Sequence, residues 1–325
     1  MSAMTWAGSI FDTAGSQAER IARLAWFIIA VSTVVYVLVL AATALAVRRA
    51  RARTSRGDLA DQAPETERRL TRHVLIATGV STILLLVYVT VTAQTGRAIA
   101  WPMNSTQQPL TVEVTGHQWW WEFRYRDSVP SNWLSTSNEL HIPVGRPVRV
   151  ILLSNDVIHS FWVPELHGKQ DAIPGHRNTT WLQADRPGVW KARCAEFCGY
   201  QHAKMAFDVV AESPARFNQW YVTQLASASP PTDSSAKRGQ DVFVQRTCVM
   251  CHTISGTPAG SRVGPELSHL ATRPSIAAGS LPNTRENLSR WILNPQLIKP
   301  GVHMPPNPLP PSEMNALLDY LETLK

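Results

Sequence analysis

The chain has 325 residues, of which 44% are hydrophobic and only 17% are charged, and its formal net charge is +7. This length is greater than that of one small domain and predicts two or three folded units. Much of the positive charge lies in one loop near the N-terminus, so the excess of basic residues does not indicate a protein that binds nucleic acid.

Two long segments contain no charged residue, namely residues 24–47 and 74–96. A helix rises about 1.5 Å per residue, so either segment can cross a hydrocarbon layer roughly 30 Å thick. Two buried core helices are the alternative. A signal peptide fits the first segment poorly, because the segment is too long and follows no basic region. We predict an outer tail over residues 1–20 and a transmembrane helical hairpin over residues 21–96.

The loop between the two segments is rich in arginine and has only four acidic residues. Short loops of this kind stay in the cytoplasm. We therefore expect a multi-pass protein of the bacterial inner membrane, with both termini and everything after Arg97 on the periplasmic side. The arginines of the loop are Arg48, Arg49, Arg51, Arg53, Arg56, Arg68, Arg69 and Arg72.

From Leu110 onward, short runs rich in β-branched and aromatic residues alternate with turn residues. Turns such as Asn155-Asp156 and Pro174-Gly175 separate them. This spacing predicts a β-sandwich or barrel within a domain over residues 97–225. The expected strands cover residues 110–114, 139–142, 147–153, 178–183, 189–193 and 205–211.

A change in composition divides this region from the rest of the chain. Residues 226–235 carry no large apolar side chain and include two prolines, which predicts a linker. Residues 236–325 have helical patterns. Thr284 is expected to cap one helix, and Ser312 is expected to cap the last helix, whose apolar residues share one face.

The four cysteines form two close pairs, Cys194 with Cys198 and Cys248 with Cys251, and histidines lie near each pair. A protein outside the cytoplasm could hold disulfides. The spacing, however, is typical of metal or haem sites.

Cys248-Val-Met-Cys251-His252 has the C-x-x-C-H pattern of covalent haem c attachment, with His252 as an iron ligand. A zinc half-site or a redox dithiol is a weaker interpretation, because the chain has neither a second C-x-x-C nor a thioredoxin-like pattern. The segment 236–325 resembles the small monohaem cytochromes c.

The sixth iron ligand is expected to be Met304, in the sequence Gly301-Val-His303-Met304-Pro-Pro. A thioether ligand raises the potential of haem iron and suits electron transfer. His303 is the main rival for this position. Met250, Met314 and His269 are weaker candidates.

A second set of metal-binding residues lies in the expected β-domain. It consists of His159 and the run Cys194-Ala-Glu-Phe-Cys198-Gly-Tyr-Gln-His202-Ala-Lys-Met205. Thiolates, imidazoles and a thioether together select copper. A mononuclear blue-copper site needs only one cysteine, so the second thiolate indicates a bridged pair of coppers. A disulfide and a zinc site are the alternatives, although zinc would leave Met205 without a role.

Taken together, the hairpin, the copper motif and the haem motif resemble subunit II of haem-copper cytochrome c oxidases in the form that carries a fused C-terminal cytochrome c domain. The resemblance implies a membrane protein with a two-helix transmembrane hairpin, an all-β cupredoxin domain and an all-α class I cytochrome c domain. It also implies a dinuclear copper A centre, whose ligands would be His159, Cys194, Glu196 through its carbonyl, Cys198, His202 and Met205.

Further roles follow from the same resemblance. The Glu196 side chain would bind Mg²⁺ at the interface with subunit I. Trp119, in Gly116-His-Gln-Trp119-Trp-Trp, would be the residue at which electrons arrive, although core packing also explains such a cluster. Glu67 stands where the family has a proton-channel glutamate, but the neighbouring tryptophan and proline are missing. His176 replaces a usual arginine.

The expected function is that of an electron-transfer subunit of a terminal oxidase and translocase. Cytochrome c or another high-potential donor would reduce the haem, and electrons would pass through the copper centre to the oxygen-reducing subunit I, with subunit III as a further partner. A copper A-containing nitric oxide reductase is the alternative. A copper-delivery protein is a weaker one, because it would need neither six ligands nor a haem.

Overall fold

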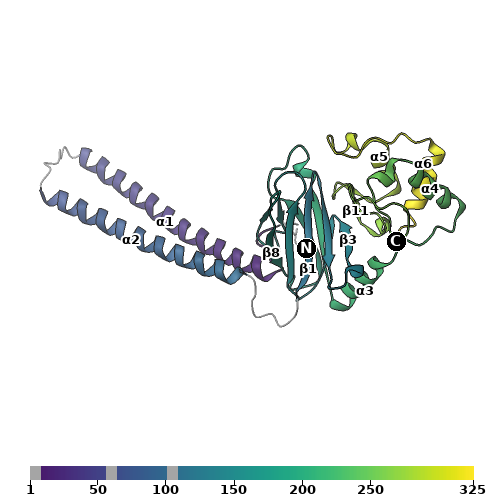
Figure 1. Ribbon diagram of the computed structural model, residues 1–325. Helices are drawn as coiled ribbons and strands as arrows, with labels where there is room; N and C mark the ends of the chain where they lie inside the picture. Colours follow the sequence, from purple (N-terminus) through teal and green to yellow (C-terminus); the bar gives the residue numbers. More distant parts are fainter. Residues whose placement is uncertain (1–8, 56–63, 101–108) are drawn as a thin grey trace, which may run out of the picture. The chain divides into compact units, whose positions relative to one another are not determined.

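The computed structural model describes residues 9–55, 64–100 and 109–325 (Figure 1). The chain divides into two compact units. One is Arg20–Pro102, and the other combines Met1–Glu19 with Met103–Lys325. The first unit is helical, whereas the second contains both the β-sheets and the C-terminal helices.

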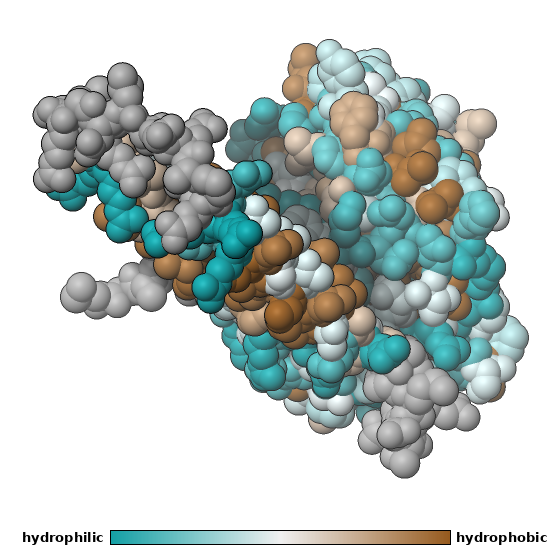
Figure 2. Space-filling model, turned by 90° about the vertical axis from the view of Figure 1, so that its left-hand side faces the viewer, coloured by the Kyte–Doolittle hydropathy of each residue, from teal (hydrophilic) through white to brown (hydrophobic). Residues whose placement is uncertain are grey.

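The helical unit consists of most of α1 (Ser16–Ser55) and of α2 (Pro64–Ile99). Their apolar windows have mean hydropathies of 2.5 and 2.4, and none of the residues that the structure describes buries them. Figure 2 shows their hydrophobic side chains as a brown surface. Threonine hydroxyls inside the helices, such as that of Thr90, donate to the carbonyl four residues earlier and so need no water. By length and composition, both helices can cross a membrane, as predicted.

The β-domain is built from two five-stranded sheets with the orders β3-β2-β1-β5-β8 and β4-β10-β9-β6-β7. Most neighbouring strands are antiparallel, but β1 pairs with β5 and β4 pairs with β10 in parallel. The strands are β1 (Leu110–His117), β2 (Trp120–Arg126), β3 (Leu134–Ser137), β4 (Glu139–Pro143), β5 (Val148–Ser154), β6 (His159–Trp162), β7 (Gln170–Ala172), β8 (Asn178–Leu182), β9 (Gly188–Cys194) and β10 (Ala206–Glu212).

The core of this domain lies between the two sheets. Side chains alternate along β2 between buried and half-buried positions, which places Trp121, Phe123 and Tyr125 inside. Their rings meet Phe207 on β10 and Phe217 on α3 (Pro214–Leu225). Such aromatic contacts bury large apolar surfaces and fix the spacing of the sheets.

All six strands expected from the sequence are present, with small shifts at their ends. The strands β2, β3, β6 and β7 and the helix α3 were not expected. Strand β2 does alternate regularly, but its two tryptophans were interpreted, with Trp119, as a functional or core-packing cluster and not as part of a strand. The four residues of β6 and the three of β7 are too few to show a period.

The chain before the hairpin belongs to the β-domain unit. The Ala14 amide donates to the Glu165 carbonyl over 2.7 Å, and the Asp185 amide donates to the Ala14 carbonyl over 2.8 Å. At Gly15 a β-carbon would lie 2.4 Å from the Gln183 carbonyl oxygen, so a side chain would not fit. The described part of the expected outer tail is therefore packed against the β-domain.

The C-terminal domain is helical, as predicted. Its helices α4 (Ser234–Gln245), α5 (Arg285–Leu293) and α6 (Pro311–Leu321) surround a core that includes Phe243, Leu288 and Leu317. A short hairpin of β11 (Ser275–Ile276) and β12 (Leu281–Pro282) joins them. The 3-10 turns η3 (Thr247–Met250), η4 (Leu270–Thr272) and η5 (Pro295–Leu297) link these elements, and η1 (Pro130–Asn132) and η2 (His202–Lys204) belong to the β-domain.

The expected helix caps have different outcomes. Thr284 caps α5, because its side chain accepts a hydrogen bond from the Asn287 amide. The prediction for Ser312 is wrong: α6 already begins at Pro311, and its N-cap Pro310 has no side-chain acceptor. Proline at the first helical position starts the helix here, since its missing N–H would have no partner in any case.

Candidate copper and haem sites

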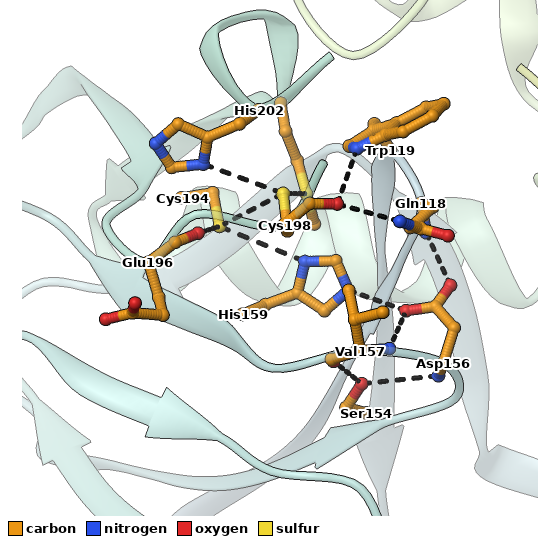
Figure 3. A network of polar contacts seen from close by, with 11 residues as sticks. Gln118, Trp119, Ser154, Asp156, Val157, His159, Cys194, Glu196, Cys198 and His202 are labelled. Atoms are coloured by element: carbon orange, nitrogen blue, oxygen red, sulfur yellow. Dashed lines mark hydrogen bonds and ion pairs between the residues drawn. The ribbon is translucent and has the colours of Figure 1, made fainter. Parts of the chain in front are cut away.

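The two thiols of the first cysteine pair face each other at one end of the β-sandwich (Figure 3). Cys194 is the last residue of β9, and Cys198 lies in the loop between β9 and η2. Both side chains are buried, and their sulfur atoms are 3.8 Å apart. A disulfide has an S–S bond of about 2.05 Å, so the thiols are free.

The other residues of the copper motif converge on these two sulfurs. The Cys194 Sγ is 3.9 Å from Nδ1 of His159 and 3.2 Å from the Glu196 carbonyl oxygen. The Cys198 Sγ is 3.6 Å from Nδ1 of His202 and 3.7 Å from Sδ of Met205. Each sulfur thus has one imidazole and one weak donor nearby, which is the division of ligands that a pair of copper ions requires.

The chemistry of this cluster suits a soft metal. The contact between the two thiols lowers the pKa of Cys194 and raises the pKa of Cys198. Thiolates are the form that binds metals. Hydrogen bonds to Asp156 and Cys194 raise the pKa of His159, although burial acts in the opposite direction. The residues present therefore fit copper.

Residues outside the proposed ligand set form hydrogen bonds to this cluster (Figure 3). One carboxylate oxygen of Asp156 accepts from Nε2 of His159 over 2.7 Å. The other accepts from the backbone N–H of Gln118 over 2.6 Å. The imidazole orientation is thereby fixed, with Nδ1 toward the thiols. The Cys198 carbonyl accepts from Nε2 of Gln118 over 2.8 Å and from the Trp119 indole N–H over 2.9 Å.

Trp119 is the predicted electron-receiving residue, and only 7% of its surface is exposed. Its indole is one hydrogen bond away from Cys198. Trp119 also lines a cavity of about 480 Å³ that is otherwise formed mainly by the cytochrome domain. This volume lies within the range of roughly 300–1,000 Å³ that cofactor sites have.

The haem motif borders the same cavity. Cys248, Cys251 and His252 all line it, and both thiols are free. Nδ1 of His252 lies 2.7 Å from the Pro265 carbonyl oxygen, which requires the proton on Nδ1 and leaves the Nε2 lone pair for a metal. Burial lowers the pKa of His252, which also favours the neutral ligand. These residues fit a covalent haem.

Of the candidates for the sixth position, Met304 and His303 both line the cavity. Met304 is half-buried and packs against the apolar core, whereas His303 is exposed. Met250 also lines the cavity but is 68% exposed on the attachment turn, and Met314 is buried in the core of α6. This arrangement favours Met304.

The loop that carries Met304 is held by one side chain. Gln296 donates to the carbonyls of Val302 and Met304 and accepts from the Gly301 amide. Gly301 has a φ of +89°, which disfavours a side chain at that bend.

Other expected site residues lie apart from these clusters. The Glu196 carboxylate is 44% exposed and is 3.9 Å from Nζ of Lys169. Within the described parts of the chain, the only grouping of potential metal ligands is His159 with Cys194 and Cys198, so Mg²⁺ at Glu196 receives no support. Glu67 is exposed on α2, and His176 is exposed in a turn.

Sequence reasoning missed three residues that shape the sites, namely Gln118, Asp156 and Lys299. Asp156 was interpreted only as a turn residue. Its position three before His159 was a usable signal, because a carboxylate commonly orients a metal-binding histidine. Gln118 and Lys299 carry no such signal, since their partners are distant in the sequence.

Comparison with known families matches both redox domains. The model described as cytochrome c oxidase subunit II, periplasmic domain, matches residues 129–213, and the model described as cytochrome c matches residues 236–325. Cytochrome c oxidase subunit 2 of Bacillus sp. (strain PS3) is 34% identical over 269 residues, which are 77% of this chain and 74% of that protein. The chain belongs to the cytochrome c oxidase subunit 2 family.

Two further relatives illustrate the extent of the similarity. Cytochrome c oxidase subunit 2 of Alkalihalophilus pseudofirmus is 41% identical over 66% of this chain, and the match spans 61% of that protein. Among solved structures, the periplasmic domain of subunit II of cytochrome oxidase from Bradyrhizobium japonicum is 31% identical. It covers 37% of this chain and 96% of its own, with a TM-score of 0.34.

The predicted fold class agrees with these findings. Two apolar helices, a β-sandwich of the cupredoxin type and a helical cytochrome c domain follow one another along this subunit 2 chain. It is a membrane-anchored protein with periplasmic domains.

Proposed function

We propose that this chain is the electron-transfer subunit of a membrane-bound terminal oxidase. It passes electrons from an external donor through haem c and a dinuclear copper A centre to an oxygen-reducing subunit I. The proposed copper ligands are His159, Cys194, the Glu196 carbonyl, Cys198, His202 and Met205, and the proposed haem residues are Cys248, Cys251, His252 and Met304. When bound, the haem and the coppers supply one-electron carriers.

The position of Trp119 is the observation that carries this proposal. It lines the cavity that His252 and Met304 also line, and its indole donates directly to the carbonyl of Cys198. One aromatic side chain therefore bridges the haem cavity and a proposed copper ligand. This position supports the passage of electrons between the two sites.

The burial of Trp119 also defines its role. At 7% exposure, its ring offers almost no surface to an external protein. We therefore assign Trp119 to the internal step between the two sites. The external donor, cytochrome c or another high-potential carrier, contacts the cytochrome domain.

The surrounding residues keep the copper site rigid and dry. His159 and Cys198 are almost fully buried, and Asp156 and Gln118 fix their orientation from the second layer. A site that cannot move or admit water changes little when its charge changes, so the energetic cost of each electron transfer stays low. The buried, hydrogen-bonded cluster supports electron transfer rather than release of copper.

The names of the relatives favour an oxidase over the nitric oxide reductase alternative. The proposed partners are subunit I, where oxygen is reduced, and subunit III. The proposed location is the bacterial inner membrane, with both termini and both redox domains on the periplasmic side. The proposed domain bounds are 1–20, 21–96, 97–225, 226–235 and 236–325.

Replacing the proposed axial methionine tests the order of electron flow. Met304→His should leave the haem low-spin and lower its potential, because imidazole stabilises ferric iron more than a thioether does. In the assembled oxidase, turnover with a high-potential cytochrome should fall several-fold, whereas turnover with a strong small-molecule reductant should persist. Unchanged turnover with the cytochrome, at normal haem content, would contradict haem-first transfer. Met250→Leu on the exposed attachment turn is the matched control.

A further inference from the structure

A lysine ammonium is buried where the cytochrome domain meets the copper loop. Only 1% of Lys299 is exposed, although lysine is among the residue types that are least often buried. Its Nζ donates to three main-chain carbonyls, those of Trp119 over 2.9 Å, Lys204 over 2.8 Å and Ala277 over 3.1 Å. All three N–H donors of the ammonium are therefore used.

These acceptors come from both redox domains. Trp119 and Lys204 belong to the β-domain, where Trp119 reaches Cys198 and Lys204 directly precedes Met205. Ala277 belongs to the cytochrome domain and has a positive φ of 54°, which turns its carbonyl into this junction. One side chain thus ties the residue between the two sites to the cytochrome domain.

Neighbouring contacts align the same segment with the copper loop. Gln201 donates from Nε2 to the Pro300 carbonyl over 2.8 Å, and Lys204 donates from Nζ to the Ile298 carbonyl over 2.5 Å. Gly301 lies against the Trp119 ring, because a β-carbon there would be 3.5 Å from Cη2. The segment from Ile298 to Gly301 therefore lies against the copper loop and Trp119. It ends at the bend that precedes Met304.

The charge of Lys299 distinguishes this contact from ordinary packing. Within the described residues, Lys299 forms no ion pair, and the groups that favour its charged form are three carbonyls and the nearby Cys198. Burial, followed by the nearby Lys204 charge, lowers the pKa of Lys299 to about 7. A buried cation without a counter-ion costs stability. The three hydrogen bonds from Nζ offset part of this cost, because an apolar side chain here would leave three carbonyls without a donor.

We propose that Lys299 is a positioning residue for electron transfer. Its hydrogen bonds hold the cytochrome domain in a fixed position against Trp119, and its positive charge favours the reduced state of the adjacent copper centre. The inference rests on the proposed function, since it assumes transfer between the two sites. A positive charge stabilises any neighbouring centre that gains an electron, and Lys299 carries that charge whenever its Nζ is protonated.

The test uses the purified full chain loaded with haem and copper. A photoactivated reductant reduces the haem, and the subsequent transfer of the electron to copper is followed from the absorbance of each centre. Lys299→Met keeps an unbranched side chain that is one atom shorter and removes its charge and donors. It should slow the transfer at least tenfold and shift the copper midpoint potential downward, with haem and copper contents unchanged.

Lys237→Met is the control. It also removes one lysine from the cytochrome domain, but the Lys237 side chain is exposed on α4 and solvent screens its charge. Its transfer rate should stay within about twofold of the wild type, and its copper potential should not move. Lys299→Gln keeps one donor group without the charge. If Lys299→Met does not fold, Lys299→Gln should still show the lowered potential.

The outcomes separate the two proposals. If the wild type transfers electrons from haem to copper and Lys299→Met does so at the same rate and copper potential, the role of Lys299 is refuted while the proposed function stands. A slowed transfer with an unchanged copper potential refutes the electrostatic part. If the wild type shows no transfer at all, the proposed function fails, and the inference fails with it.

Discussion

Gly116 shows how closely the backbone approaches a proposed copper ligand. A β-carbon at this position would lie 2.6 Å from Cδ2 of His159, in a ring whose other side is held by Asp156. The ring has no free space into which it could move, because His159 is fully buried. The absence of a side chain at residue 116 is therefore part of the metal site.

We expect the wild type to bind two coppers per chain and Gly116→Ala to bind fewer, with an altered copper spectrum. The reason is that the added methyl group must displace the His159 imidazole from the thiols. Metal analysis and visible spectroscopy measure both effects, and the haem content should be unchanged. Gly260→Ala, where a β-carbon meets nothing within 4 Å, is the control. Stoichiometric zinc, or one copper per wild-type chain, would rule out a dinuclear copper site.

For single residues, the proposed metal ligands can be selected from the sequence, whereas the residues distant in sequence that hydrogen-bond to them cannot. The spacing of Cys194, Cys198 and His202 is a local pattern that chemistry limits to few metals, so the residue order alone is enough to select them. The hydrogen bond from Gln118 to the Cys198 carbonyl joins residues 80 positions apart. Contacts of this kind depend on how the strands pair, which no local pattern encodes.

Among the elements, helices α4 and α6 make the closest crossing that the C-terminal domain shows. At Gly239 on α4, a β-carbon would lie 1.9 Å from the Ala316 carbonyl oxygen and 2.8 Å from Cβ of Tyr320. The two helix backbones are thus in direct contact at this point. Glycine usually weakens a helix, so its presence here is explained by packing.

Gly239→Ala should force α4 and α6 apart and destabilise the cytochrome domain by about 1–3 kcal/mol, the usual cost of overpacking. The measurement is denaturant unfolding of the haem-loaded chain, followed through the haem absorbance, which reports this domain. Gly260→Ala again serves as the control and should unfold like the wild type. Equal stabilities of the two variants would mean that the helices can separate at no cost.

The secondary structure was predictable where periodicity is long. The apolar face of α6 and the six expected strands were correct because each has enough residues to show a pattern. The cap at Ser312 was wrong because Pro311 can begin the helix without a side-chain acceptor. Helix α3 was missed because its residues, such as Phe217, fell within the range assigned to the expected β-domain.

For the whole molecule, the composition of the sequence predicts the order of the domains. The hydrogen bonds that join one domain to another are known only from the structure. The hairpin, β-domain and cytochrome domain could be separated from charge-free runs, turn spacing and the polar linker. The junction at Lys299 could not be predicted, because it joins main-chain carbonyls to a lysine up to 180 residues away. A lysine at that position has the same sequence signature as any surface lysine.

The linker gives a test of the membrane orientation. Ser229, Pro230 and Thr232 are exposed between the two redox domains, although Pro231 is buried and the Ala228 amide donates to the Ser255 carbonyl, so these three residues are the accessible part of the linker. Protease added to right-side-out membranes should cut there and yield a C-terminal fragment that carries covalent haem, detectable by its haem after denaturing electrophoresis. In sealed inverted vesicles the linker should be protected if, as we propose, the eight arginines keep the hairpin loop in the cytoplasm. Cleavage of the linker in inverted vesicles alone would reverse the orientation and place both redox sites on the cytoplasmic side.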